Sequence, residues 1–390
     1  MKLPFLQSVP RDVSVWRGAA AGVGRCSAPS CRSTAMPEVH RQSIVATVCL
    51  GASMPGRARS RVVIATSLSG GRHMRTLLAV VVLCSFVALS HAAGIKFLTI
   101  PGDGSAPALK AIVWTPCTDS AEDLTVGPYV LRGRRDCPTA GHMLPLVVVS
   151  HGHGGSYLGH HDLAEFLADA GFVVAAINHP GDTFSDMSRA AEISEFVERP
   201  TDIKRLVDFM LDDAPDAAKI DATRIGFFGF SRGGYTGLVL AGGSPDFANA
   251  NVPCTDPNLP ICHEIKLERT PMTLVRDDRI KAYVLADPLN EFPRARELEN
   301  VTAPIQLWAS QFGGDGVLPG TIPALADALP KRPEFHFVPQ AGHFAFLAPC
   351  SIQLKQIAPE VCVDATGFDR SAFHAHFDQM TLQFFKANLR

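Results

Sequence analysis

Short stretches rich in hydrophobic residues recur between residue 95 and the C-terminus, and some of them, such as residues 144–149, are unbroken apolar runs. Such runs are typical of strands that are covered on both faces of a sheet. We predict eight strands, at residues 95–100, 110–114, 144–149, 172–177, 225–228, 280–285, 305–309 and 334–338. Amphipathic or buried helical stretches are predicted at residues 161–170, 200–211, 234–240, 323–329 and 368–389. This alternation predicts an α/β fold with a mostly parallel, eight-stranded sheet flanked by helices.

One stretch interrupts the alternation just before the sixth predicted strand. Residues 242–278 are rich in proline, contain two cysteines and show little periodicity. We interpret them as a loop-rich excursion over one edge of the sheet. No repeat or linker divides the chain beyond this point or before it, so we predict that residues 93–390 form one domain.

The region before this domain carries the pattern of an export signal. Met74 and Arg75 are followed by a mostly apolar run at residues 77–89, and then by the sequence SHAA, which ends at Ala93. This order of charged, apolar and small residues predicts a secretory signal peptide at residues 74–92 and an exported, periplasmic or secreted protein. A buried core helix is the alternative interpretation. The run is too short to span a bilayer comfortably, so no stable membrane span is expected.

Residues 1–73 are basic, with ten Lys or Arg residues and only two acidic residues. Because export signals lie at the N-terminus, we predict that translation starts at Met74 and that residues 1–73 are a non-native or disordered extension. An organellar transit peptide and a disordered basic arm are the alternatives. The whole chain has a formal charge of -2 and is 46% hydrophobic, which is typical of a globular protein and does not suggest nucleic-acid binding.

The cysteines fit export to an oxidising compartment. Six cysteines follow the predicted signal peptide, and they fall into three locally spaced pairs. We predict the disulfides Cys117–Cys137, Cys254–Cys262 and Cys350–Cys362, although six cysteines allow 15 connectivities. Free buried thiols are the alternative. No pair has the C-x-x-C spacing of zinc or dithiol redox sites.

The main candidate for catalysis lies at the end of the fifth predicted strand. Residues 224–234 read RIGFFGFSRGG, so a G-x-S-x-G motif with Ser231 at its centre joins a strand to a small, apolar helix. In this setting the motif predicts a nucleophile elbow, a strained turn that presents the serine hydroxyl above the sheet. Eight strands with the elbow after the fifth resemble the α/β-hydrolase fold. The resemblance covers nearly all residues after the signal peptide.

The resemblance implies a catalytic triad in the chain order nucleophile, acid, base. His343 is the predicted base because it follows the last strand in a glycine-containing loop. The acid is left open between Asp315, which follows the seventh strand and is favoured, and Asp287, which follows the sixth. Backbone bonding in a strand-ending turn is the alternative role of Asp287.

The resemblance also implies an oxyanion hole. One donor is the backbone N–H of Arg232, the residue after the nucleophile. The second is expected from the HGHGG loop at residues 151–155, where related hydrolases with His-Gly-x-Gly use the amide that corresponds to His153. His151 is expected to brace this loop and not to transfer protons.

Four longer strings, RIGFFGFSRGG, VVVSHGHGGS, INHPGDT and AGHFAFLAPC, resemble the predicted dienelactone-hydrolase group, which is similar to platelet-activating-factor acetylhydrolases. Dienelactone hydrolases proper use a cysteine nucleophile, whereas this chain has Ser231. The sequence therefore predicts an exported serine esterase for small-molecule esters with small or short acyl groups, without a metal or organic cofactor. An amidase or peptidase with the same triad and a non-catalytic binding protein are the alternatives, and the sequence does not indicate the oligomeric state.

Overall fold

A computed structural model of the chain describes residues 92–104, 106–250, 258–266 and 274–390. The predicted extension at 1–73, most of the predicted signal peptide, and Cys254 lie outside the described residues. The strands are β1 Ala92–Ile100, β2 Leu109–Cys117, β3 Glu122–Val126, β4 Tyr129–Arg135, β5 Leu144–Ser150, β6 Val173–Ile177, β7 Ile220–Phe230, β8 Ile280–Ala286, β9 Ile305–Ser310 and β10 Glu334–Val338. The α-helices are α1 His161–Asp169, α2 Ile193–Asp212, α3 Arg232–Leu240, α4 Pro260–Lys266, α5 Thr321–Ala328, α6 Ile352–Ile357 and α7 Arg370–Asn388.

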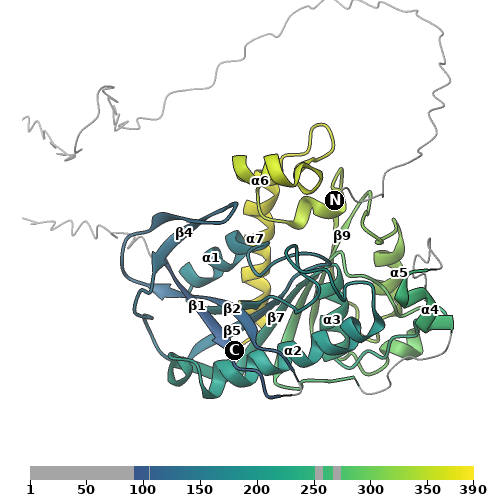
Figure 1. Cartoon of the computed structure of the whole chain (residues 1–390), viewed down its shortest axis with the longest axis horizontal. Helices are drawn as coiled ribbons and strands as arrows, with labels where there is room; N and C mark the ends of the chain where they lie inside the picture. Colours follow the sequence, from purple (N-terminus) through teal and green to yellow (C-terminus); the bar gives the residue numbers. More distant parts are fainter. Residues whose placement is uncertain (1–91, 105, 251–257, 267–273) are drawn as a thin grey trace, which may run out of the picture. The chain divides into compact units, whose positions relative to one another are not determined.

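The strands form one sheet in the order β10-β9-β8-β7-β5-β6-β2-β1-β4-β3 (Figure 1). Strands β5 to β10 are parallel to one another, whereas β2 is antiparallel to both β1 and β6. The predicted α/β class and mostly parallel sheet are confirmed, and all eight predicted strands are present. Parallel strands place their carboxyl ends at one edge, so the loops after β5, β7, β8, β9 and β10 gather there.

Two additional strands, which are not among the eight predicted ones, form a hairpin. Strands β3 and β4 are antiparallel, and β4 adds to β1 at the edge of the sheet. Gly127 has a φ of 55° in the turn between them, a conformation that glycine adopts without a Cβ penalty. Because most of the hairpin faces solvent and only alternate positions such as Leu131 are buried, its hydrophobic signal is weak.

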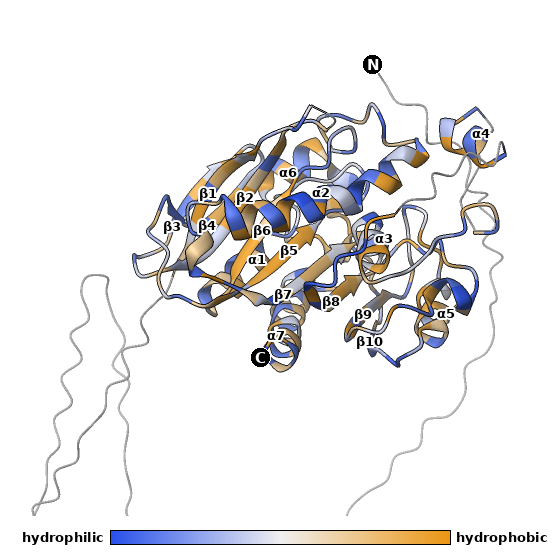
Figure 2. Ribbon diagram, turned by 90° about the horizontal axis from the view of Figure 1, so that it is seen from below, coloured by the Kyte–Doolittle hydropathy of each residue, from blue (hydrophilic) through white to orange (hydrophobic). Residues whose placement is uncertain are grey.

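Alternate residues of the central strands pack into two separate hydrophobic cores, one on each face of the sheet. On β5, Leu146 and Val148 belong to the core that α2, α3 and α5 cover. Val147 and Val149 belong to the core that α1 and α7 cover. Figure 2 shows β5 and β6 as hydrophobic along most of their length, which is the pattern expected of strands buried on both faces.

The start of α2 differs from the prediction. The sequence predicted a helix that begins at Pro200. Helix α2 instead begins at Ile193, and Pro200 lies inside it. Ile193 and Phe196 in the added turns are buried in the core, and this packing compensates for the backbone hydrogen bond that proline removes.

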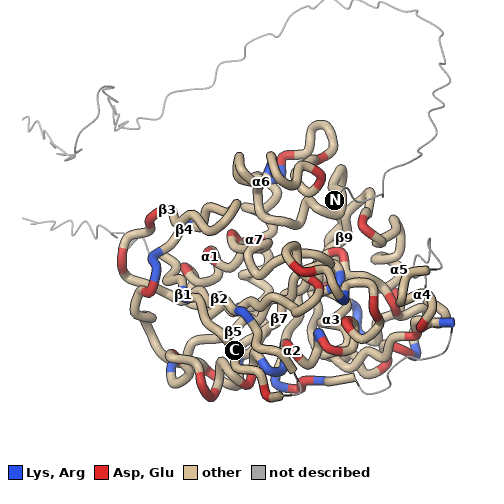
Figure 3. The backbone as a smooth tube through the Cα atoms, in the orientation of Figure 1, with Lys and Arg blue, Asp and Glu red and all other residues tan. Residues whose placement is uncertain are grey.

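Two of the predicted disulfides, Cys117–Cys137 and Cys350–Cys362, are present in the structure. Cys262 is also disulfide-bonded, but its predicted partner Cys254 lies outside the described residues. The first pair links the end of β2 to the segment after β4, and the second closes the loop around α6. Among the described residues, no helix has the length and apolar character needed to cross a membrane. Acidic and basic residues are interspersed over the described elements (Figure 3).

Candidate active site

Ser231 occupies the sharp turn between β7 and α3. Its backbone has φ 56° and ψ -118°, a sparsely populated conformation that costs about 1–3 kcal/mol. The flanking glycines make the turn possible, because a Cβ on Gly229 would lie 2.3 Å from the Gly233 oxygen. A Cβ on Gly233 would lie 1.9 Å from the oxygen of Ser150, at the end of β5. The G-x-S-x-G motif therefore satisfies a real steric requirement here.

The backbone of Ser231 is bonded to the residues that flank Asp287. Its N–H donates to the Ala286 oxygen at 3.0 Å, and its own oxygen accepts from the Leu289 N–H at 3.0 Å. Asp287 directly follows β8, the neighbour of β7 in the sheet. These two bonds fix the strand-ending turn of Asp287 relative to the turn of Ser231.

His343 begins a 3₁₀ helix, His343–Phe346, in the loop after β10. Its ring Nδ1 lies 3.0 Å from Asp287 Oδ2, and both side chains are almost completely buried. Since a carboxylate only accepts, Nδ1 carries the proton and Nε2 is left with a free lone pair in the neutral imidazole. Nε2 is buried and has no hydrogen-bond partner among the described residues. The ring lies 4.6 Å from that of Phe230, the residue before Ser231.

The carboxylate of Asp287 is held from its other side by Ser310, the last residue of β9. The Ser310 N–H donates to Oδ1 at 2.7 Å, and the Ser310 hydroxyl donates to Oδ2. Asp287 has an exposed fraction of 0%. Three donors therefore fix the carboxylate in one orientation, and the backbone donor among them belongs to β9 and not to the strand-ending turn that the alternative role of Asp287 would use.

Asp315, which the sequence analysis favoured as the acid, lies elsewhere. Its side chain is exposed, and the acidic partner that the structure gives to His343 is Asp287. The loop after β9 does reach His343, but through its backbone: the His343 N–H donates to the Gly313 oxygen at 2.8 Å. A Cβ on Gly314 would lie 3.0 Å from the His343 Cβ, so the loop packs against the histidine without presenting its carboxylate.

The HGHGG loop after β5 packs directly against the nucleophile turn. A Cβ on Gly152 would lie 3.2 Å from the Ser231 Cβ and 3.0 Å from the Phe230 ring. Arg232 is the first residue of α3, so its N–H has no acceptor within the helix. The backbone of His153 belongs to the same loop, while its side-chain Nδ1 points to Asp182 Oδ1 at 3.1 Å, outside hydrogen-bond geometry.

A buried cluster of charged side chains around Asp182 holds the HGHGG loop in place. Asp182 Oδ2 accepts from Arg199 Nη2 at 2.9 Å and from Arg232 Nη1 at 2.7 Å, and Asp182 Oδ1 accepts from the Gly154 N–H at 2.9 Å. Arg199 also donates to the His151 oxygen at 2.8 Å. Burial raises the pKa of Asp182, but Arg199, His153 and Arg232 outweigh it and hold this pKa well below its ordinary value.

The sequence analysis missed the supporting role of this cluster. Neither Asp182 nor Arg199 was given a role from the sequence, because nothing in the local pattern of α2 marks a buried arginine. His151 does brace the loop as expected: it bonds the Gly152 oxygen at 2.7 Å and accepts from the His179 N–H at 3.2 Å. Burial, and then Arg199, lowers the pKa of His151, which is therefore neutral.

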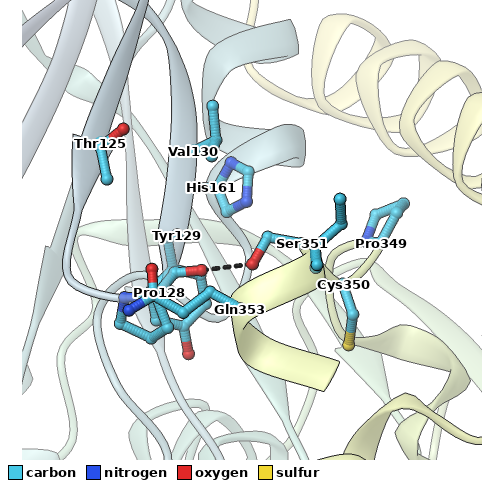
Figure 4. A pocket seen from close by; sticks show the side chains of 10 residues that line it. Thr125, Pro128, Tyr129, Val130, His161, Pro349, Cys350, Ser351 and Gln353 are labelled. Atoms are coloured by element: carbon cyan, nitrogen blue, oxygen red, sulfur yellow. Dashed lines mark hydrogen bonds between the residues drawn. The ribbon is translucent and has the colours of Figure 1, made fainter. Parts of the chain in front are cut away.

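Two other features of the described residues lie apart from Ser231. Two clusters of potential ligand side chains occur: Cys117 and Cys137 with Asp119, where the cysteines form a disulfide, and Asp162 with His374 and Asp378. A cavity of about 450 Å³ lies between the β3–β4 hairpin and α6 (Figure 4). Its lining includes Tyr129, His161 and Ser351, and Ser351 Oγ donates to the Pro128 oxygen across it. Neither the clusters nor the lining includes the residues around Ser231.

Comparison with known proteins agrees with the fold. Residues 141–265 match the Hydrolase_4 family, described as serine aminopeptidase, S33. A ferulic acid esterase from Streptomyces cinnamoneus is 21% identical, covers 78% of this chain and 92% of its own, and superposes with a TM-score of 0.53. A dienelactone hydrolase from Anabaena variabilis ATCC 29413 is 14% identical, covers 76% and 99%, and has a TM-score of 0.44. No curated protein matches the sequence. The likeness to the ferulic acid esterase structure therefore shows the fold, which is that of the α/β hydrolases.

Proposed function

We propose that this protein is a serine hydrolase that cleaves carboxylic esters through an acyl-enzyme, with Ser231, His343 and Asp287 as its triad. The observation that carries the proposal is the buried bond from His343 Nδ1 to Asp287 Oδ2 at 3.0 Å. It leaves the Nε2 lone pair of His343 as a base beside the strained turn of Ser231. Nucleophile, acid and base occur in this chain order, as the α/β-hydrolase arrangement requires.

In the proposed reaction, Ser231 Oγ attacks the ester carbonyl carbon while His343 Nε2 takes the hydroxyl proton. The tetrahedral intermediate collapses, and the departing alcohol takes the proton from Nε2 and leaves an acyl group on Ser231. A water molecule then attacks the acyl group with His343 again as the base, and the carboxylic acid is released. Asp287 stays ionised throughout, holds the working tautomer of His343, and stabilises the imidazolium as it forms.

The backbone N–H groups of Arg232 and His153 are the proposed oxyanion-hole donors. The first begins α3, and the positive end of the helix dipole adds to its effect. The second lies in the loop that packs on Ser231 through Gly152. Such donors matter because negative charge grows on the carbonyl oxygen in the transition state, and the loss of one costs about 3–4 kcal/mol.

Small or short-acyl esters are the proposed substrates, and an amide or peptide substrate is the second candidate. The sequence strings shared with the acetylhydrolase-like group favour short acyl chains. The name of the ferulic acid esterase that shares this fold also favours an ester. The description of the matching family as a serine aminopeptidase favours the amide candidate, since the same triad serves both reactions.

A fluorophosphonate probe and a panel of chromogenic substrates test the proposal. We expect the probe to label the full chain and not Ser231→Ala, with circular dichroism showing that the variant is folded. We expect p-nitrophenyl acetate and butyrate to be hydrolysed faster than longer esters and than alanine p-nitroanilide. Faster anilide hydrolysis would establish the amide candidate. A folded wild-type protein that neither reacts with the probe nor hydrolyses any substrate would refute a hydrolase and favour a binding protein.

Export is also proposed. The disulfides Cys117–Cys137 and Cys350–Cys362 support it, because such bonds persist in oxidising compartments. N-terminal sequencing of the protein purified from its native source tests the position of the signal. We expect the mature chain to start near Ala93, at the beginning of β1, and a start before Met74 would contradict the predicted signal peptide.

A further inference from the structure

A buried histidine on α7 is hydrogen-bonded on both sides of its ring. His374 Nδ1 lies 2.6 Å from Asp162 Oδ2 of α1, and His374 Nε2 lies 2.9 Å from the backbone oxygen of Ala345. An ionised carboxylate and a carbonyl oxygen both act only as acceptors. Both bonds therefore exist together only when the imidazole carries a proton on each nitrogen.

The backbone carbonyl that His374 holds belongs to the loop of the proposed catalytic base. Ala345 lies two residues after His343, in the same 3₁₀ helix. The next carbonyl, that of Phe346, accepts from His160 Nδ1 at 3.2 Å. Burial lowers the pKa of His160 to about 4, so this ring is neutral and donates through one nitrogen. Two histidines thus donate hydrogen bonds to two consecutive carbonyls of the loop. Only His374 must be positively charged to form both of its own hydrogen bonds.

The charged groups around His374 come from its own helix, α7, and from α1, which packs against it. Asp162, His161 and Glu165 lie on α1, where His161 Nδ1 pairs with Glu165 Oε1 at 3.0 Å. Asp378 follows His374 by one turn on α7, and burial, and then Asp162, raises its pKa to about 8. Burial alone lowers the pKa of His374, but Asp162, Asp378 and the Ala345 carbonyl raise it, and the net pKa lies above the ordinary 6.5.

We propose that His374, as an imidazolium, is a positioning residue that ties the loop of His343 to α1 and α7. This inference rests on the hydrolase function proposed above. When the ring loses a proton, the remaining one stays on Nδ1 beside the Asp162 carboxylate, because charge-assisted bonds are the stronger ones. The Ala345 carbonyl then loses its donor, and the His343 loop loosens. Because the pKa of His374 is raised, the restraint is complete below the ordinary histidine value and is lost as the pH rises through the raised pKa.

The substitution Asp162→Asn tests whether the bond from His374 to the Ala345 carbonyl requires a positive charge on the ring. An asparagine amide N–H donates to an unprotonated Nδ1, so a neutral His374 with its proton on Nε2 keeps both bonds. We expect kcat of the wild type for p-nitrophenyl acetate, corrected for the enzyme-free rate, to fall at least fivefold on an alkaline limb that Asp162→Asn lacks. His374→Gln should lower kcat at least tenfold at neutral pH with KM changed less than twofold. His376→Gln, an exposed position two residues away, is the matched control and should match the wild type.

NMR of the ¹⁵N-labelled full chain tests the protonation state without reference to activity. We expect both ring nitrogens of His374, assigned by their absence in His374→Gln, to be protonated at pH 6, and the Nε2 proton to be lost at alkaline pH. A ring with one protonated nitrogen at pH 6, or an alkaline limb that persists in Asp162→Asn, would overturn the inference. A ring signal that shifts when EDTA or zinc is added would also overturn it, because a metal would then take the place of the proton. A wild type that shows the NMR titration but no hydrolysis would refute the proposed function alone.

Discussion

Replacement of Asp287 by asparagine is the sharpest test of the active-site geometry. The Ser310 N–H donates to Oδ1 at 2.7 Å, so an asparagine at this position must keep its carbonyl oxygen there. Its amide nitrogen is then forced to the place of Oδ2, where it faces His343 Nδ1. An N–H donor at that point stabilises the tautomer with the proton on Nε2, and such a histidine cannot accept the Ser231 proton.

The expected loss follows from this wrong tautomer. In a serine protease triad the same change lowers kcat by about 10⁴-fold, which corresponds to about 5 kcal/mol of transition-state stabilisation. We expect Asp287→Asn to lower kcat for p-nitrophenyl acetate by about 10³- to 10⁴-fold. Because the side chain is isosteric, we expect KM to change little. Steady-state kinetics with pre-steady-state burst measurement at pH 7.5 provides both values.

Asp315→Asn is the matched control, since it makes the same chemical change at an exposed position in the neighbouring loop. We expect its kcat to stay within about twofold of the wild type, because exposed substitutions away from a site have small effects. Circular dichroism must show that both variants are folded. A dead Asp315→Asn with an active Asp287→Asn would refute the assignment and show that the loop after β9 rearranges to present its carboxylate.

Three further predictions concern stability. Asp182→Asn should lower the free energy of unfolding by about 3–5 kcal/mol in urea titrations at pH 7, because two buried arginines lose their counter-charge. Since the pKa of Asp182 is held well below its ordinary value, these ion pairs stabilise the fold above about pH 4 and are lost as the pH falls further, so the difference between variant and wild type should shrink in acid. Gly233→Ala should prevent folding of the nucleophile turn, seen as loss of soluble protein and of probe labelling, because its Cβ would overlap the oxygen of Ser150; a soluble, labelled variant would contradict this. Opening the Cys350–Cys362 disulfide by a double serine substitution should cost about 3 kcal/mol by loop-closure entropy over its 12-residue separation, and an unchanged melting temperature would contradict it.

The central sheet was predictable because its signal is local. Strands β5 to β9 are mostly buried on both faces, so each contains a mainly apolar stretch in the sequence. The β3–β4 hairpin was missed because one of its faces meets solvent and its strands carry charges. The first turns of α2 were missed because Pro200 was interpreted as a start, when only tertiary packing shows that it lies inside the helix.

In the candidate site too, residues with a local sequence signal were predictable and those set by tertiary contacts were not. Ser231 and His343 could be named from the sequence, because each follows a strand in a motif whose glycines have a steric purpose. The choice between Asp287 and Asp315 could not, since both follow a strand and both lie in turns with a positive φ. What separates them is the position of Ser310, which donates to one carboxylate across the neighbouring strand. Sequence spacing carries no information about that contact.

The position of Asp287 after β8 also links the proposed acid directly to the proposed nucleophile. Strand β8 is adjacent to β7, and Ala286 and Leu289, which lie before and after Asp287, each form a backbone hydrogen bond with Ser231. An acid after β9 would lie one strand further away and would be connected to the nucleophile through His343. The structure instead gives each member of the proposed triad its own backbone restraint: Ser231 through the turn of Asp287, Asp287 through Ser310, and His343 through Gly313 on one side and the Ala345 carbonyl on the other. Of these four restraints, the His374 bond to Ala345 is the one that the inference above makes dependent on an imidazolium.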